Sequence, residues 1–293
     1  MNILITGSSG FIGSNLVNNL LETEAELLTL SRKNKTINYK KHLFIDLKNF
    51  EKIKKKIIIF KPDIVIHLAW QDIPDYSFEV QYLNFKISIN FLNFIINETN
   101  CKKIIVSGSC WEYGINKGPC VEGHDNRINS YFSWSKKSLY SFLNLLCKEK
   151  SINLIWLRIF YVYGPGQKKT SLIPSLVNSI LKSKKIYIKF PYNCNDYIYI
   201  EDLINAFNFV IYNKMESGIY NLGSGKTHSV LKIAKILEQK ISGNNIMSNR
   251  IHNKKISYRR INFWADKKKS KKIFKDIKLI SIEQGLEKYL NSL

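Results

Sequence analysis

The chain has 293 residues, and its hydrophobic fraction of 45% and charged fraction of 23% are ordinary for a soluble globular protein. Its longest apolar runs are too short to span a bilayer, so we expect no membrane partner and a cytoplasmic location. The net charge of +22 comes from scattered lysines rather than from a basic motif, which argues against nucleic acid as a partner. The five cysteines form no CxxC pair and no two histidines have metal-ligand spacing, so we expect free thiols and no metal.

The first two-thirds of the chain alternates short apolar runs with helical periods, which is typical of βαβ units. The predicted strands are 2–6, 26–30, 43–45, 63–67, 103–107 and 153–159, and the predicted helices are 11–21, 50–60, 78–97, 134–148 and 171–181. This order predicts an α/β fold, with a Rossmann-like doubly wound parallel sheet and a smaller C-terminal substrate-binding cap. We expect 1–165 to form the cofactor domain, with 193–220 returning to it, and 166–192 and 221–293 to bind substrate.

Three glycines in residues 7–13 stand between the first strand and the first helix. In a dinucleotide-binding loop the first glycine permits a tight turn, the second lets backbone approach the pyrophosphate, and the third lets helix and strand pack closely. The helix N-terminus then presents N–H groups to the phosphates. The residues expected to contact the cofactor here are Gly7, Ser9, Gly10, Phe11, Ile12 and Gly13.

The end of the second strand indicates which dinucleotide is bound. NAD sites usually carry an acid there for the ribose 2′-hydroxyl, whereas an arginine accommodates the 2′-phosphate of NADP. This chain has Arg32 and Lys33, with Ser31 as a further hydrogen-bond donor, which favours NADP(H). The alternative is that Arg32 and Lys33 are exposed loop residues.

Further motifs follow the later strands. They are Asp46-Leu47, His67-Leu68-Ala69, Asn84, Tyr163-Gly164-Pro165-Gly166, Asp196-Tyr197-Ile198 and Tyr220-Asn221-Leu222-Gly223. With these marks the chain resembles the extended short-chain dehydrogenase/reductases, the NAD-dependent epimerase/dehydratase family that modifies nucleotide-sugars. The resemblance runs from the first residue to about Gly225. It implies that Asp46 and Leu47 lie near the adenine. It also implies further cofactor contacts from Leu68, Ala69, Trp70, Asn84, Ser107, Lys136 and Tyr161.

A narrower resemblance links the segments 67–76, 108–114 and 158–164 to nucleotide-sugar 4-ketoreductases such as the dTDP-6-deoxytalose-forming type. In this family a Ser or Thr, a Tyr and a Lys four residues after the Tyr carry out the reaction. The tyrosine is the proton donor, and the lysine lowers its pKa. Ser109 and Lys136 match two of these positions, but Phe132 stands where the tyrosine is expected.

Three interpretations of Phe132 are open. The first is an engineered Tyr-to-Phe change that inactivates the enzyme. The second is a one-residue insertion that lets Tyr131 act, although its spacing from Lys136 places it on another helix face. The third is a natural loss, which leaves a binding protein or an enzyme with another acid.

Substrate contacts are expected from Trp70, Ser109, Cys110, Trp111, Tyr131, Asn195 and Arg259. Trp70, Trp111 and Tyr76 would form apolar walls for a deoxysugar or ordinary packing. Tyr161 and Asn195 replace the family's usual Asn and Arg, so Arg259, Arg260 or Lys255 would have to bind the diphosphate. Cys110 and Trp111 follow Ser109 where a 4,6-dehydratase carries Asp-Glu, which argues against dehydration.

These observations predict an NADP-dependent oxidoreductase that reduces the C4 ketone of a nucleoside-diphosphate 4-keto-6-deoxy sugar, for the sugars of surface polysaccharides. A nucleotide-sugar 4-epimerase that holds NAD and a catalytically silent cofactor-binding regulator are the alternatives. By family analogy we expect a homodimer that packs through residues 78–97 and 134–148 of each subunit.

Overall fold

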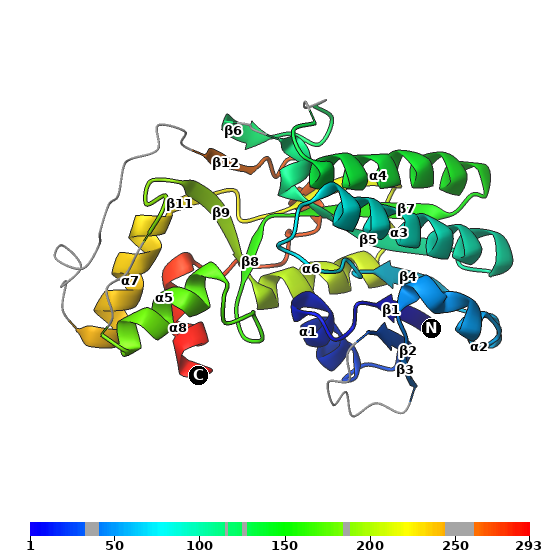
Figure 1. Cartoon of the computed structure of the whole chain (residues 1–293), viewed down its shortest axis with the longest axis horizontal. Helices are drawn as coiled ribbons and strands as arrows, with labels where there is room; N and C mark the ends of the chain where they lie inside the picture. Colours follow the sequence, from blue (N-terminus) through cyan, green and yellow to red (C-terminus); the bar gives the residue numbers. More distant parts are fainter. Residues whose placement is uncertain (33–40, 115–116, 125–127, 184–187, 244–260) are drawn as a thin grey trace. The chain divides into compact units, whose positions relative to one another are not determined.

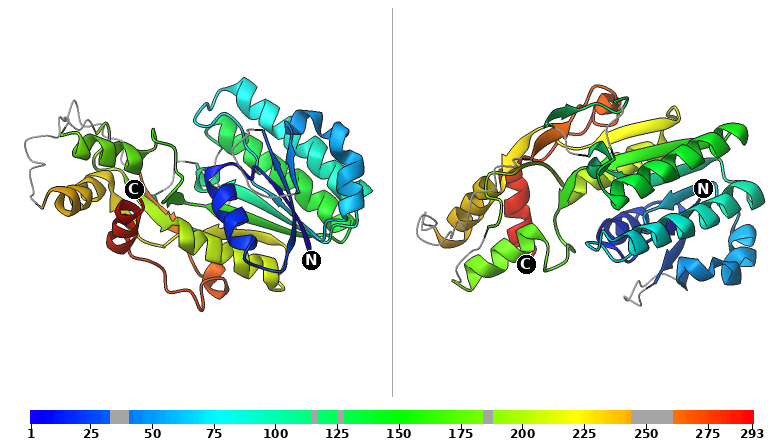
Figure 2. Two further views of the ribbon diagram at one scale, coloured as in Figure 1. Left: turned by 90° about the horizontal axis from the view of Figure 1, so that it is seen from below. Right: turned by 45° about the horizontal axis from the view of Figure 1, so that its top comes forward.

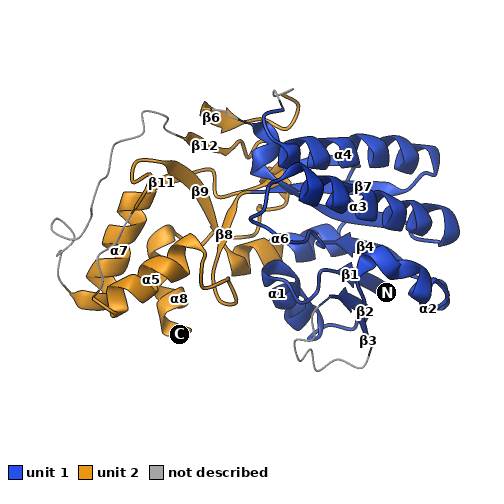
Figure 3. Cartoon of the chain, viewed as in Figure 1, with its two compact units in different colours: residues 1–114, 125–159, 206–220 blue, residues 115–124, 160–205, 221–293 orange. Residues whose placement is uncertain are grey.

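The computed structural model describes residues 1–32, 41–114, 117–124, 128–183, 188–243 and 261–293. The chain divides into two compact units (Figure 3). The first comprises Met1–Gly114, Asp125–Ile159 and Ala206–Tyr220, and the second comprises Ile115–His124, Phe160–Asn205 and Asn221–Leu293. Each unit is therefore assembled from segments that are distant in the sequence.

The first unit is built on a parallel sheet of seven strands in the order β10-β7-β5-β4-β1-β2-β3. The strands are β1 (Asn2–Thr6), β2 (Glu26–Ser31), β3 (His42–Phe44), β4 (Ile64–His67), β5 (Lys103–Ser109), β7 (Asn153–Ile159) and β10 (Gly218–Leu222). The apolar runs of the inner strands are buried on both faces, as a sheet covered by helices requires, whereas Phe44 on the edge strand β3 is exposed. The predicted fold class is confirmed, and the predicted strands of this sheet form with small shifts at their ends.

Helices cover both faces of this sheet. On one face, α1 (Phe11–Leu20) lies beside α6 (Ile200–Tyr212), and the Asn208 amide donates to Asn19 Oδ1 at 2.7 Å. On the other face are α2 (Lys54–Phe60), α3 (Phe78–Glu98) and α4 (Tyr131–Glu149). Helices α3 and α4 lie side by side in all views (Figures 1 and 2). This arrangement is the doubly wound architecture that the alternating pattern predicts.

Two helix predictions need correction. Residues 50–60 form a 3₁₀ helix, η1 (Leu47–Ile53), followed by α2 rather than one helix, with a kink at Asn49. Helix α4 begins at Tyr131, three residues before the predicted start. The aromatic residues there have modest helix propensity, but Ser130 caps the helix by accepting from Ser133 N at 3.2 Å. The earlier start places Phe132 in the first helical turn.

The second unit has a small mixed sheet in the order β11-β9-β12-β6, and β8 also pairs with β9. These strands are β6 (Lys117–Cys120), β8 (Tyr161–Tyr163), β9 (Cys194–Tyr199), β11 (Thr227–Ser229) and β12 (Asn262–Ala265). The helices α5 (Leu172–Leu181), α7 (Val230–Ser242) and α8 (Ile282–Asn291) belong to this unit. Ion pairs Lys240–Glu287 at 2.8 Å and Lys232–Glu283 at 3.6 Å join α7 to α8.

Buried Asp196 holds the second unit's loops together. Its carboxylate accepts hydrogen bonds from Ser224 N at 2.7 Å, Gly225 N at 2.9 Å and Ala265 N at 3.0 Å. Burial raises the pKa of this carboxyl, and these donors oppose the rise. The motif residue Asp196 therefore has a structural role in its own unit. Among the residues that the structure describes, no helix is long and apolar enough to cross a membrane.

Candidate active site

The loops of the first unit meet at the carboxyl edge of its sheet. Thr6 pairs with His67, and His67 pairs with Val106, so β1, β4 and β5 end close together. Ligands of open α/β sheets bind at this edge, where the loops after the strands converge. The glycine loop, Ala69 and Ser109 therefore belong to one region of the unit.

The glycine loop is packed too tightly for side chains at two positions. A Cβ at Gly7, where φ is +71°, would lie 2.7 Å from Ala69 N, and a Cβ at Gly13 would lie 2.2 Å from Gly7 O. Helix α1 begins after Gly10 with no side-chain cap. Its first N–H groups are therefore available to an anion, as the pyrophosphate of a dinucleotide requires. These residues fit the pyrophosphate of a dinucleotide cofactor.

The end of β2 carries an arrangement that the sequence did not reveal. Arg32 donates to Gln71 Oε1 at 2.6 Å and to Asp72 Oδ1 at 3.0 Å. Both acceptors come from the loop after β4. Buried Ser31 shares a hydrogen bond of 3.1 Å with His42 Nε2. The local sequence has no acid at the end of β2, but the fold brings the Asp72 carboxylate next to Arg32.

Other predicted cofactor residues lie in the segments that follow β3 and β4, up to and including α3. Asp46 caps η1 by accepting from Lys48 N at 3.0 Å, and Leu47 is buried beneath it. Leu68 N donates to Thr6 O at 3.2 Å, which keeps the chain after β4 against β1. Buried Asn84 accepts from Gln71 N at 2.8 Å and donates to Gln71 O at 3.1 Å. Asn84 therefore fixes the loop that carries Asp72.

His67 is a structural residue. Its ring is fully buried, with Nδ1 3.0 Å from Thr6 Oγ1 and Nε2 3.0 Å from Ser88 Oγ. Burial and, to a lesser degree, the Lys136 charge lower the pKa of His67 to about 3. The imidazole is therefore neutral near pH 7 and links β1, β4 and α3.

Ser109 is held by a buried carboxylate. It caps η2 (Cys110–Tyr113), with Oγ accepting from Trp111 N at 3.2 Å and its own N–H donating to Glu112 Oε1 at 2.7 Å. Glu112 also accepts from Trp156 Nε1 at 3.0 Å and from Arg158 Nε at 2.9 Å. Glu112 and Arg158 form a buried ion pair that fixes the turn after β5. The sequence offers a capping signal for Glu112 but no sign of its two partners on β7.

Lys136 and Phe132 share the Trp70 ring. Lys136 Nζ donates to Ser107 O at 2.8 Å and lies 3.6 Å from the centre of the indole. The Phe132 ring meets Trp70 edge-on with centroids 6.2 Å apart. Burial lowers the pKa of the Lys136 ammonium to about 7, and the Glu112 charge opposes part of that shift. Such a strongly perturbed cation at the end of parallel strands is characteristic of a functional site.

Tyr131 lies on a different face of α4. Its ring is 53% exposed and packs edge-on against Phe78 of α3, with centroids 5.4 Å apart. Phe132 instead is buried and contacts the Tyr76 ring at 5.4 Å. The structure therefore places Phe132, not Tyr131, with Trp70 and Lys136.

The remaining predicted site residues are less closely grouped. Cys110 is buried and Trp111 is partly buried in η2, next to Ser109. Tyr161 and Asn195 belong to the second unit, where the Tyr161 ring lies 5.9 Å from the Tyr197 ring. The Asn195 amide donates to the Tyr197 hydroxyl at 3.2 Å. Lys33, Lys255, Arg259 and Arg260 lie outside the described residues.

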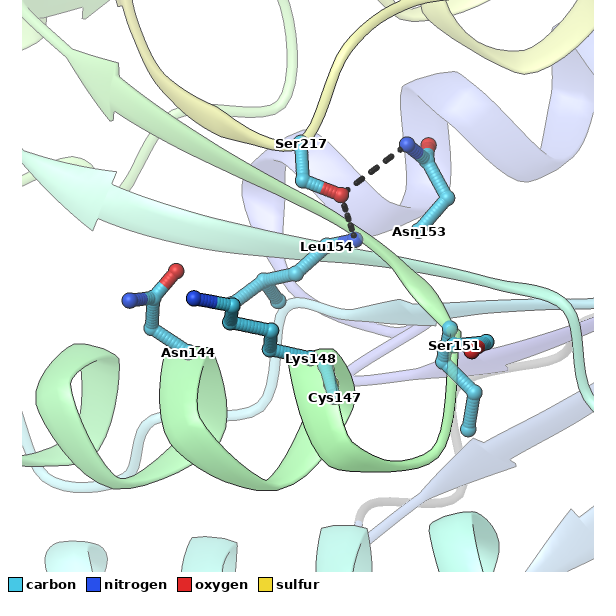
Figure 4. Close-up of a pocket in the computed structure, with 8 residues that line it drawn as sticks. Asn144, Cys147, Lys148, Ser151, Asn153, Leu154 and Ser217 are labelled. Atoms are coloured by element: carbon cyan, nitrogen blue, oxygen red, sulfur yellow. Dashed lines mark hydrogen bonds between the residues drawn. The ribbon is translucent and has the colours of Figure 1, made fainter.

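A pocket of the first unit lies away from these residues (Figure 4). It is lined by Asn144, Cys147 and Lys148 from the last turns of α4, and by Asn153 and Leu154 at the start of β7. Ser217 accepts from both Asn153 Nδ2 and Leu154 N at 3.1 Å. The start of β7 is the opposite edge of the parallel sheet, so this pocket is separate from the candidate active site.

Comparison with protein families matches residues 3–223 to the NAD dependent epimerase/dehydratase family. The match spans the glycine loop, Ser109 and Lys136. The chain belongs to this family. Family membership supports a nicotinamide dinucleotide as cofactor and places the chain among epimerases, dehydratases and reductases of nucleotide-sugars.

Curated members of the family align with most of the chain. The ADP-L-glycero-D-manno-heptose-6-epimerase of Brachyspira hyodysenteriae is 28% identical over 267 residues, which cover 81% of this chain and 80% of that protein. The dTDP-4-dehydro-6-deoxyglucose reductase of Escherichia coli is 29% identical over 263 residues, covering 82% of each chain. The structure of UDP-glucuronic acid 4-epimerase from Bacillus cereus has a TM-score of 0.86 at 24% identity, covering 99% of this chain and 98% of that one. This last likeness concerns the fold.

Proposed function

We propose that this family member reduces the C4 ketone of a nucleoside-diphosphate 4-keto-6-deoxy sugar with NADPH. The observation that carries the proposal is that Lys136 lies against the Trp70 ring and hydrogen-bonds to Ser107 O of β5, the strand that ends at Ser109. The bound reduced dinucleotide would supply a hydride. Lys136 and Ser109 would position the ketone oxygen, on which negative charge develops. The name of the Escherichia coli relative, dTDP-4-dehydro-6-deoxyglucose reductase, gives a substrate of this class.

The residues after Ser109 favour reduction over dehydration. Cys110 and Trp111 occupy the positions where family dehydratases carry an acid–base pair, and the Cys110 side chain is buried. The nearby carboxylate of Glu112 is fully engaged with Ser109 N, Trp156 and Arg158. Neither Cys110 nor Glu112 is therefore positioned to act as the acid or the base of a dehydration.

A nucleotide-sugar 4-epimerase is the second candidate, and the Arg32–Asp72 ion pair favours it. An acid close to the end of β2 suits the free 2′-hydroxyl of NAD better than the 2′-phosphate of NADP. An epimerase would keep NAD bound and return the hydride to the other face of the sugar. The second unit is proposed to bind the nucleotide-sugar, and Asn195 and Arg259 remain the candidates there.

Exposed aromatic residues on α3 and α4 support the proposed homodimer. Phe78, Tyr82 and Tyr131 are 44%, 41% and 53% exposed, and Phe78 stacks on Tyr82 with ring centroids 5.4 Å apart. Exposed aromatic clusters are enriched at interfaces. A second copy of α3 and α4 would cover them. Sedimentation of the intact chain tests this, because a monomer at micromolar concentration would contradict the dimer.

The function is tested by NADPH oxidation with a panel of nucleoside-diphosphate 4-keto-6-deoxy sugars, using this chain and its Phe132→Tyr variant. If Phe132 is the defect, tyrosine should raise turnover by about 10²–10⁴-fold, the usual contribution of a general acid. If neither protein oxidises NADPH but both bind the nucleotide-sugars, the result would favour the epimerase. If neither protein oxidises NADPH and neither binds a nucleotide-sugar, the result would favour the cofactor-binding regulator.

A further inference from the structure

We propose that Tyr76 supplies the proton-donating phenol that position 132 lacks. The inference rests on the proposed ketone reduction and deepens it by naming the acid. It corresponds to the third interpretation of Phe132, in which another side chain has taken over the proton transfer. All residues concerned belong to the first unit.

Tyr76 lies directly beside the position from which the family tyrosine acts. Its ring meets the Phe132 ring at 66°, with centroids 5.4 Å apart, and Phe132 in turn meets the Trp70 ring. Lys136 Nζ lies 3.6 Å from the centroid of the same Trp70 ring. Tyr76, Phe132, Trp70 and Lys136 thus form one continuous cluster. Tyr76 is its only phenol among the described residues.

Hydrogen bonds hold the backbone on both sides of Tyr76. Fully buried Gln81 donates to Asp75 O at 2.6 Å and accepts from Trp70 Nε1 at 2.9 Å. Asp75 Oδ1 accepts from Ser77 N at 2.9 Å. Gln81 therefore links the Asp75 backbone to the Trp70 side chain, whose ring also contacts Lys136. A catalytic side chain needs such support, because small displacements reduce the rate of proton transfer.

The environment of Tyr76 suits a proton donor. Tyr76 is 47% exposed, whereas Phe132 is 7% exposed, so Tyr76 is the more accessible of the two rings. Partial burial of the phenol raises the pKa of Tyr76, and the nearby Cys110 thiol adds to the rise. The phenol is therefore protonated near neutral pH, which is the form that a reduction requires.

The proposed step balances. The bound reduced dinucleotide would supply a hydride to the C4 carbon of the ketone, and Tyr76 Oη would give its proton to the carbonyl oxygen, which would yield a secondary alcohol. The phenolate left on Tyr76 regains a proton from solvent. Other nearby phenols are less suited, since Tyr131 faces Phe78 and Tyr113 is buried against Arg158.

The test compares kcat and KM of the intact chain with those of Tyr76→Phe, Phe132→Tyr and the double variant, using the sugar panel and NADPH. Tyr82→Phe is the matched control, because Tyr82 is similarly exposed and stacks on Phe78 outside the cluster. Tyr76→Phe should lower kcat by about 10²–10⁴-fold with KM changed much less, and Tyr82→Phe should leave both unchanged. Phe132→Tyr should restore activity to the double variant.

A second readout is independent of turnover. Calorimetric titration of the cofactor-free chain with the nucleotide-sugar should show about 2–10-fold weaker binding to Tyr76→Phe, the value of one lost hydrogen bond. An intact chain that is inactive while Phe132→Tyr is active would overturn the role of Tyr76 and leave the proposed function standing. Equal kcat in Tyr76→Phe and Tyr82→Phe would also overturn it. Inactivity of every variant would instead overturn the proposed function.

Discussion

Two buried cations in the first unit have opposite surroundings. Arg158 on β7 is 4% exposed and is paired with Glu112, 2.9 Å away, within a set of hydrogen bonds to Trp156 and Ser109. Lys136 on α4 is 3% exposed and contacts the Ser107 carbonyl and the Trp70 ring, with no carboxylate at ion-pair distance among the described residues. A buried charge with a full set of partners serves the fold, whereas one without a counter-charge is costly, which supports the functional role proposed for Lys136.

Substitution of Lys136 should separate stability from activity. We expect Lys136→Met to lower turnover by about 10²–10⁴-fold, because the positioning charge is lost. Its free energy of unfolding should be equal to or greater than that of the intact chain, since an apolar side chain of similar size replaces a poorly solvated cation. Urea unfolding measured beside turnover checks this. A strongly destabilised Lys136→Met would contradict the functional assignment of Lys136.

The stability difference should depend on pH in a defined direction. The pKa of Lys136 is lowered from 10.5 to about 7 in the folded chain, so between these values the unfolded chain binds more protons. The stability of the intact chain should then rise with pH across this window relative to Lys136→Met. The advantage of the methionine variant should be greatest below pH 7 and disappear near pH 10.5. Urea unfolding at several pH values measures it.

Substitution of Glu112 should produce the opposite pattern. Glu112→Ala leaves Arg158 buried without a counter-charge, so we expect a loss of about 3–5 kcal/mol in the free energy of unfolding. The control Glu79→Ala removes a carboxylate from the exposed first turn of α3 and should change stability far less. If Glu112→Ala is as stable as this control, the claim that Arg158 depends on its buried carboxylate partner would be contradicted.

The smallest expected effect concerns Arg32, which is a partly exposed cation. Asp72→Asn removes its carboxylate partner and leaves the neutral Gln71 oxygen as an acceptor, so the guanidinium charge is more available to a 2′-phosphate. We expect the preference for NADPH over NADH to rise by about 2–5-fold, in line with the modest strength of exposed ion pairs. Fluorescence titration with each dinucleotide measures it. Weaker NADH binding with NADPH binding unchanged would indicate that Asp72 binds the ribose 2′-hydroxyl and would favour the epimerase, whereas an unchanged preference would contradict a role for Asp72 in dinucleotide choice.

Local sequence information identified the elements and the positions of the motifs. The alternation of apolar runs and helical periods predicted the parallel sheet, and the glycine spacing predicted the tight contact of Gly7 and Gly13. The distance of four residues from Phe132 to Lys136 placed both on one face of α4, as the structure shows. These predictions succeeded because each depends on residues within one turn, strand or helix.

Contacts between distant segments could not be predicted from the sequence. Nothing local connects Arg32 with Asp72, Glu112 with Arg158, or Tyr76 with Phe132, because each pair joins loops and strands that meet only when the sheet assembles. The start of α4 at Tyr131 depended on the Ser130 cap outweighing weak local propensity. The sequence by itself determined the family, the sheet and the missing phenol. Only the tertiary structure decided which side chains surround Lys136, because side-chain proximity depends on packing across the sheet edge.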